Sequence, residues 1–182
     1  MYGMINSSMR RMVIEQHGEE FWASLVSDFD LPDDFSTMHI YPDDLTYRFV
    51  SALGERLSVA PEFVLESFGR FFIRDLRASQ FGSLLRIFGP DFRQCVSNLN
   101  MMHEHMGGSF EGMIPPRFDI EEMGPNDLLL KYYSQRPGLE SMVTGLLAGL
   151  AEFYDENMTL HSMTLSQDQE GNPVHLFHLT LY

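Results

Sequence analysis

The sequence predicts an α+β fold in which helices form roughly the first hundred residues and a sheet forms within the last sixty. Three observations predict it. Apolar residues recur at helical spacing in the N-terminal part, an alternating segment lies at the C-terminus, and Gly and Pro residues separate the segments. A chain of 182 residues can bury one core, so we expect one domain over residues 1–182.

Helices are expected where apolar residues repeat with the helical period: residues 4–16, 19–28, 43–57, 61–76 and 91–106. Gly18 separates the first two, and the Pro-containing residues 29–42 are expected to form a loop. Asp43 or Asp44 is expected to cap the third helix, and Pro61 to occupy the first position of the fourth.

The C-terminal part predicts a sheet and one long helix. Residues 128–133 are apolar and aromatic and predict a strand, whereas residues 139–154 have strong helical periodicity. Residues 157–167 and 173–182 predict a hairpin around Gly171. We therefore expect a helical N-terminal subdomain packed on a C-terminal subdomain that contains an antiparallel sheet and the long helix.

The composition excludes several classes of protein. A formal charge of -14 disfavours nucleic-acid binding. Cys95 is the only cysteine, which rules out an internal disulfide and a Cys-rich zinc site. The most apolar run, residues 141–151, is shorter than the roughly 20 residues that a membrane span needs. With no signal peptide at the N-terminus, we expect a soluble, cytoplasmic chain that binds neither nucleic acid nor membrane.

His103 is the most informative of the seven histidines. At about 100° per residue, one stripe of the helix over 91–106 contains Phe92, Val96, Leu99, His103 and Met106. His105 faces the opposite side, toward water. An imidazole in apolar surroundings needs a partner, which an axial bond to haem iron or a backbone carbonyl would supply. Periodicity alone favours the carbonyl.

A Tyr-x-Ser-x-Arg element follows in the segment KYYSQRPG. If the strand continues, Tyr132, Ser134 and Arg136 share one face, because side chains alternate along a strand. Together they offer donors to a pair of carboxylates, such as haem propionates. A half-exposed strand with a surface arginine is the alternative interpretation.

An inward histidine, a Pro115-Pro116 loop and the Tyr-x-Ser-x-Arg element occur here in that order. In this combination the sequence resembles the H-NOX family, the haem domains related to soluble guanylate cyclase. The resemblance covers about residues 1–182, through MYG at the start, FG at Phe68-Gly69, NLNMMHEHM, the PP loop, LKYYSQRPGL and GLLAGLAEFY.

The resemblance implies one haem b per chain, between the two subdomains. It implies that His103 is the protein ligand to iron and that Pro116 presses on the haem. The propionates would be held by Tyr132, Ser134 and Arg136. The distal side would be lined by Met4, Ile5, Phe72, Met142 and Leu146.

The function that the resemblance implies is gas sensing rather than catalysis. Nitric oxide, and also carbon monoxide, would bind the ferrous haem, and release of His103 would signal to a partner. In the family that partner is a histidine kinase or a cyclic-dinucleotide enzyme, and this chain looks like a stand-alone bacterial-type member. Oxygen-binding members have a tyrosine where Met142 stands, so oxygen is not expected to bind. An adaptor or apolar-ligand module without haem is the alternative, and a haem enzyme ranks third because the distal stripe lacks acid–base groups.

Overall fold

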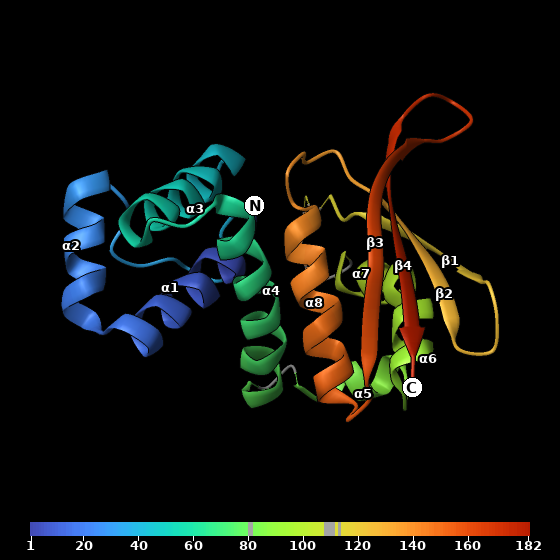
Figure 1. Cartoon of the computed structure of the whole chain (residues 1–182). Coiled ribbons are helices and arrows are strands. Elements are labelled where there is room, and N and C mark those ends of the chain that lie inside the picture. Colours follow the sequence, from blue (N-terminus) through green and yellow to red (C-terminus); the bar gives the residue numbers. More distant parts are fainter. Residues whose placement is uncertain (80–81, 108–111, 113) are drawn as a thin grey trace.

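A computed structural model describes residues 1–79, 82–107, 112 and 114–182. Figure 1 shows two halves side by side, with helices α1–α4 on one side and the sheet with α5–α8 on the other. The N-terminal half contains α1 (Gly3–His17), α2 (Glu19–Phe29), α3 (Asp43–Leu57) and α4 (Pro61–Ala78). The C-terminal half contains α5 (Gly82–Phe88), α6 (Phe92–Ser97), α7 (Leu99–Gly107), β1 (Arg117–Glu122), β2 (Asp127–Tyr133), α8 (Glu140–Phe153), β3 (Met158–Gln167) and β4 (Pro173–Leu181).

The N-terminal half follows the predicted helical pattern closely. Pro61 occupies the first turn of α4, where its missing N–H costs nothing. The buried side chains of the four helices form one apolar core around Trp22, Phe49 and Phe68. The predicted loop is also present between α2 and α3. Asp43 and Asp44 lie in the first turn of α3, but no side chain caps that helix, so the predicted capping role is wrong.

The C-terminal half is built on an antiparallel sheet with strand order β1-β2-β4-β3 among the described residues. Leu128, Leu130 and Tyr132 of β2 are buried on its inner face. Helix α8 contributes Val143, Leu147 and Leu150 to the same core. The predicted hairpin is confirmed, because β3 and β4 pair antiparallel along their length.

Two features of the C-terminal half differ from the prediction. The single helix expected over residues 91–106 is two helices, separated at Asn98, whose side chain donates to the Phe88 carbonyl at 2.7 Å. Strand β1 was not predicted, because its sequence RFDIEE is mostly charged. It is an edge strand, paired on one side with β2, and charged residues are typical of such edges.

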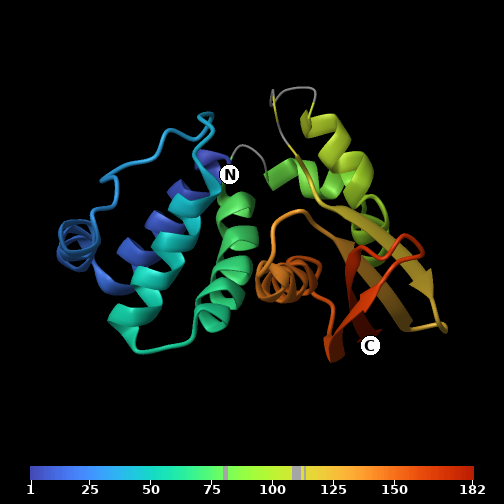
Figure 2. The ribbon, with the colours of Figure 1, turned by 90° about the horizontal axis from the view of Figure 1, so that it is seen from above.

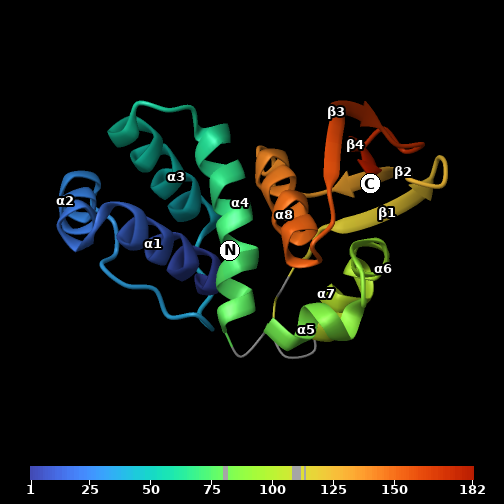
Figure 3. The same ribbon diagram turned by 60° about the horizontal axis from the view of Figure 1, so that its bottom comes forward.

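Helices α4 and α8 join the two halves and pack directly on each other, as Figure 2 shows from above and Figure 3 from below. A methyl group added to Gly145 would lie 1.9 Å from the Glu66 carbonyl oxygen, and one added to Gly69 would lie 2.2 Å from the Met142 carbonyl oxygen. Only glycine therefore allows the two backbones to approach this closely. None of the helices in the described residues is long and apolar enough to cross a membrane.

Candidate functional site

His103 lies on α7 with its ring against the sheet. The ring stacks on that of Phe118 in β1, with centroids 5.8 Å apart and planes 13° from parallel. Its Nδ1 atom is buried and has no hydrogen-bond partner among the described residues. Burial lowers the pKa of His103, and the nearby Leu99 backbone only partly opposes this shift. The imidazole is therefore neutral near pH 7, which is the form that binds a metal.

The stripe predicted around His103 is present despite the break at Asn98. Phe92, Val96 and Leu99 are buried. His105, by contrast, is exposed, and its ring lies 6.1 Å from that of Phe88 between centroids, in an edge-on arrangement. The Met106 side chain lies outside the described part of the chain. The distinction between an inward and an outward histidine is confirmed.

Asn100 fixes α7 to the sheet, one turn before His103. Its Nδ2 donates to the Phe118 carbonyl at 2.5 Å, and its Oδ1 accepts from the Phe118 N–H at 2.8 Å. The amide therefore supplies the hydrogen bonds that a further strand would make at this edge. The sequence did not reveal this contact, because strand β1 was not predicted.

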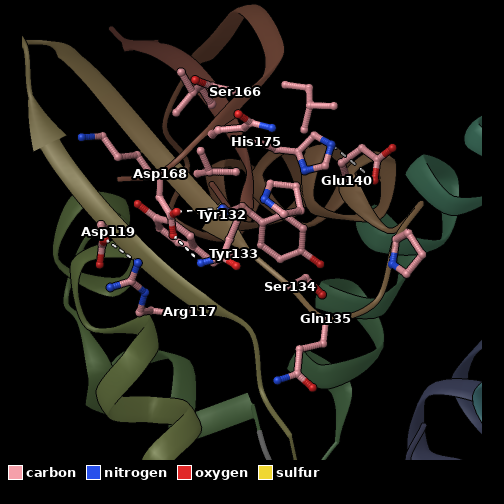
Figure 4. Close-up of a pocket in the computed structure, with 18 of the residues that line it drawn as sticks. Arg117, Asp119, Tyr132, Tyr133, Ser134, Gln135, Glu140, Ser166, Asp168 and His175 are labelled. Carbon is pink, nitrogen blue, oxygen red and sulfur yellow. Dashed lines mark hydrogen bonds and ion pairs between the residues drawn. The ribbon is translucent and has the colours of Figure 1, made fainter. Parts of the chain in front are cut away.

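The Tyr-x-Ser-x-Arg residues do not share one strand, so that part of the prediction is wrong. Strand β2 ends at Tyr133, and the chain then turns because the Ser134 hydroxyl oxygen accepts the Arg136 backbone N–H at 3.0 Å. Tyr132 alone lies in the strand, with its side chain buried. Burial raises its pKa, although a hydrogen bond with Ser134 opposes the shift. Tyr132 and Ser134 thus remain neighbours, as Figure 4 shows.

Arg136 links the two halves. Its Nε donates to Asp43 Oδ2 at 2.8 Å, and its Nη1 donates to the Ile114 carbonyl at 2.7 Å. The other oxygen of Asp43 accepts from the amino group of Met1. Burial would raise the pKa of Asp43, but the amino group and Arg136 together lower it, so this carboxylate is charged. Asp43 is a site residue that the sequence analysis missed.

An open groove of about 1540 Å³ meets this end of the sheet. Figure 4 shows Tyr132, Ser134 and Gln135 beside it, with His175 and Glu140 facing each other at 3.9 Å between Nε2 and Oε2. The groove does not reach His103 or the predicted distal residues.

Four of the five predicted distal residues gather where the halves meet. Ile5, Phe72, Met142 and Leu146 belong to one apolar cluster, and Leu146 also packs against the core of the C-terminal half. Met4 is half-buried and lies outside this cluster. Pro116 is half-buried immediately before β1.

Three polar side chains, those of Tyr132, Tyr133 and Asn6, are candidates for a hydrogen-bond donor near the predicted distal residues. Tyr132 is within the sheet, and the ring of Tyr133 lies under the Arg117 guanidinium, at 3.9 Å from the ring centroid. Asn6 is fully buried; its Oδ1 accepts from Thr46, whereas its Nδ2 has no partner among the described residues. Sequence reasoning missed this amide because Asn6 is one of several polar residues in α1, and helical periodicity does not single it out.

The chain matches the haem-NO-binding family, HNOB, over residues 2–162. It is 28% identical over 174 residues to soluble guanylate cyclase gcy-35 of Caenorhabditis elegans, which covers 92% of this chain and 25% of that protein. It is 30% identical over 168 residues to gcy-32 of the same organism, covering 88% of this chain and 24% of that protein. The chain thus spans about a quarter of the length of these relatives.

The fold is also that of solved H-NOX structures. An H-NOX protein from S. oneidensis in the Fe(II)NO ligation state has a TM-score of 0.83 and 21% identity, covering 100% of this chain and 99% of that one. The I5F mutant of T. tengcongensis H-NOX has a TM-score of 0.85 and 15% identity, covering 100% and 97%. The fold and the family match agree, and this chain belongs to the haem-NO-binding family.

Proposed function

We propose that this chain is a haem-based sensor of nitric oxide. The observation that carries the proposal is His103: a neutral, stacked imidazole whose buried Nδ1 has no hydrogen-bond partner among the residues that the structure describes. Haem iron, when bound, would supply the position at which a diatomic gas binds. His103 would be its protein ligand. Turning Nδ1–H toward the Leu99 carbonyl would fix the tautomer and leave Nε2 for the metal.

The residues of the β2 end fit the carboxylates of one haem b per chain. Tyr132 and Ser134 would donate hydroxyl hydrogens to them. Arg136 would donate from the guanidinium N–H groups that are not engaged by Asp43 and Ile114. Asp43 would then hold Arg136 in place without competing with the haem carboxylate, because the planar guanidinium of Arg136 has enough N–H groups to donate to both carboxylates.

The distal side would consist of apolar side chains, which are listed here in chain order: Met4, Ile5, Phe72, Met142 and Leu146. Pro116 would press on the opposite face. An apolar distal side holds nitric oxide and carbon monoxide at ferrous iron without a hydrogen-bond donor. Bound oxygen carries more negative charge and gains more from a donor.

Release of His103 is the proposed output step. If His103 were released, the remaining contacts of α7 with the sheet, such as the Asn100 amide, would hold the helix less firmly and would allow it to move. A partner protein would recognise the moved surface. We propose a histidine kinase or a cyclic-dinucleotide enzyme as that partner; the relatives described above are guanylate cyclases that carry this domain within a longer chain.

An adaptor module without haem is the second candidate. It is favoured by the groove at the β2 end, which does not reach His103. The absorption spectrum of the purified protein distinguishes the haem-based sensor from the haem-free adaptor. The purified protein should be red, with a Soret band that shifts when nitric oxide is added to the reduced form. A colourless protein that takes up no added haemin would contradict the sensor.

The release step has its own test. His103→Gly supplied with free imidazole keeps a ligand on the haem but removes the tether to α7. Hydrogen exchange across residues 92–106 should then match the nitric-oxide-bound wild type. Exchange that matches the unliganded wild type would show that the motion has another cause.

A further inference from the structure

The outer face of the β3–β4 hairpin contains a pair of histidines from neighbouring strands. Leu160 pairs with Leu179 and Ser162 pairs with His178, so His161 is the extra residue of a bulge. The rings of His161 and His178 lie 5.3 Å apart between centroids and are tilted by 48°. His161 is exposed and His178 is half-buried, so the pair is open to solvent.

A relay of hydrogen bonds fixes the tautomer of His161. Thr180 donates its hydroxyl hydrogen to Asp127 Oδ1 at 2.5 Å, because a carboxylate can only accept. The Thr180 oxygen lies 2.7 Å from His161 Nε2 and must therefore accept from it. In the neutral ring the lone pair is then on Nδ1. A histidine that binds a metal through one ring nitrogen usually donates the N–H of the other nitrogen to an acceptor, and here that acceptor is Thr180, which is itself hydrogen-bonded to a carboxylate.

We propose that His161 and His178 bind a divalent transition-metal cation, of the zinc class, on the outer face of the sheet. Two imidazoles on one tetrahedral zinc ion, with Zn–N bonds of about 2.0 Å, place their ring centroids about 5 Å apart. The observed separation of 5.3 Å meets this requirement. Imidazole nitrogen suits zinc, copper and nickel, whereas calcium and magnesium prefer oxygen.

The site is open rather than closed. No group of three or more His, Cys, Asp or Glu side chains in the described ranges is arranged to hold a metal. Water or an outside ligand would complete the coordination. Because Asp127 belongs to β2, a bound cation would tie the edge strand β3 through β4 to the middle of the sheet. The spacing rules for metal motifs missed this pair because its members come from adjacent strands.

Titration calorimetry with zinc chloride on the purified, haem-loaded protein tests the proposal. We expect one saturable zinc ion per chain. His161→Gln and His178→Gln should each weaken binding at least tenfold. Thr180→Val should weaken it by about tenfold to a hundredfold, the usual effect of removing an outer-shell partner. His17→Gln, at an exposed histidine on α1, is the matched control and should leave binding unchanged.

A second measurement reports the location directly. Zinc should slow amide hydrogen exchange along β3 in the wild type and not in the double variant H161Q/H178Q. Zinc binding of equal affinity in the double variant, or no saturable binding in the wild type, would overturn the proposal. Neither outcome involves His103, so the gas-sensing function is tested separately.

Discussion

The side-chain amide of Asn100 makes two hydrogen bonds to the backbone of Phe118, accepting at 2.8 Å and donating at 2.5 Å. The ring of the same Phe118 stacks on His103. Phe118 of the edge strand β1 is therefore bound to α7 through its backbone, and its side chain contacts His103, the candidate iron ligand. These contacts of α7 with strand β1 meet at Phe118.

Asn100→Ala should destabilise the protein by about 2 kcal/mol, because it leaves the Phe118 N–H and carbonyl without partners. The free energy of unfolding, from urea titration, measures this. Amide exchange should also rise in α7. Asn126→Ala, at an exposed position before β2, is the control and should change the stability little. A wild-type unfolding curve for Asn100→Ala would show that the contact contributes nothing.

His103→Gly should give a protein that retains haem well only with added imidazole, because the variant lacks the proposed protein ligand to iron. His105→Ala should leave the absorption spectrum nearly unchanged, since that side chain is exposed. The spectra of both variants with and without imidazole check this. Haem loss in the His105 variant together with retention in the His103 variant would reverse the assignment.

Arg136→Ala should speed haem transfer to apomyoglobin by at least about tenfold, because a charged hydrogen bond is worth roughly 1.5–3 kcal/mol. Tyr132→Phe and Ser134→Ala should have smaller effects. Arg136→Lys should recover only part of the loss, because lysine lacks the planar fork. A transfer rate equal to that of the wild type in Arg136→Ala would remove this residue from the site.

Asp43→Asn should lower the stability at neutral pH and change its acid dependence. The Met1 amino group and Arg136 lower the pKa of Asp43 below its usual value of 3.8, against the opposing effect of burial. Because the pKa of Asp43 is lower in the folded than in the unfolded protein, its ionised carboxylate stabilises the fold at pH values above the unfolded pKa. This stabilisation is lost as the pH falls through the folded pKa. The difference between the variant and the wild type should therefore begin to shrink as the pH falls below about 4, and should disappear only below the folded pKa of Asp43.

Unfolding free energies measured at several pH values test this convergence. Asp44→Asn, at the exposed neighbouring position, is the control. A difference between Asp43→Asn and the wild type that stays constant down to pH 3 would mean that the ion pair with Arg136 does not contribute.

The ferrous protein should not form a stable oxy spectrum in air. Neither Met142 nor Phe72 can donate a hydrogen bond, and a donor worth roughly 1.5–3 kcal/mol changes affinity by tenfold to a hundredfold or more. Met142→Tyr should make oxygen bind. If the wild type binds oxygen, Asn6→Leu tests whether Asn6 is the donor, because its Nδ2 is buried and has no hydrogen-bond partner among the described residues.

Much of the fold is predictable from local pattern, and much of the site is not. The core helices and the β4 strand carry periodicity that a single sequence displays. Strand β1 does not, because an edge strand with one exposed face tolerates Arg117 and its acidic neighbours. The stripe around His103 was predicted because its residues lie close together in the sequence and keep the helical spacing across α6 and α7.

The contacts that complete the site join residues far apart in the chain. Asp43 meets Arg136 across 93 positions, and Asn100 meets Phe118 across 18 positions. No periodicity relates such pairs, so the role of Asp43 could not be predicted. The pair formed by His161 and His178 was hidden for the same reason.

The long-range contacts at the β2 end also set an order of events during translation. Arg136 reaches Asp43 from 93 positions away, and Tyr47 donates to the Pro137 carbonyl from 90 positions away. At a synthesis rate of about 5–20 residues per second, roughly 5–20 s pass between the synthesis of α3 and that of these partner residues. Helix α3 is therefore synthesised before the residues that anchor it, and in the proposed sensor haem would be bound only late in synthesis.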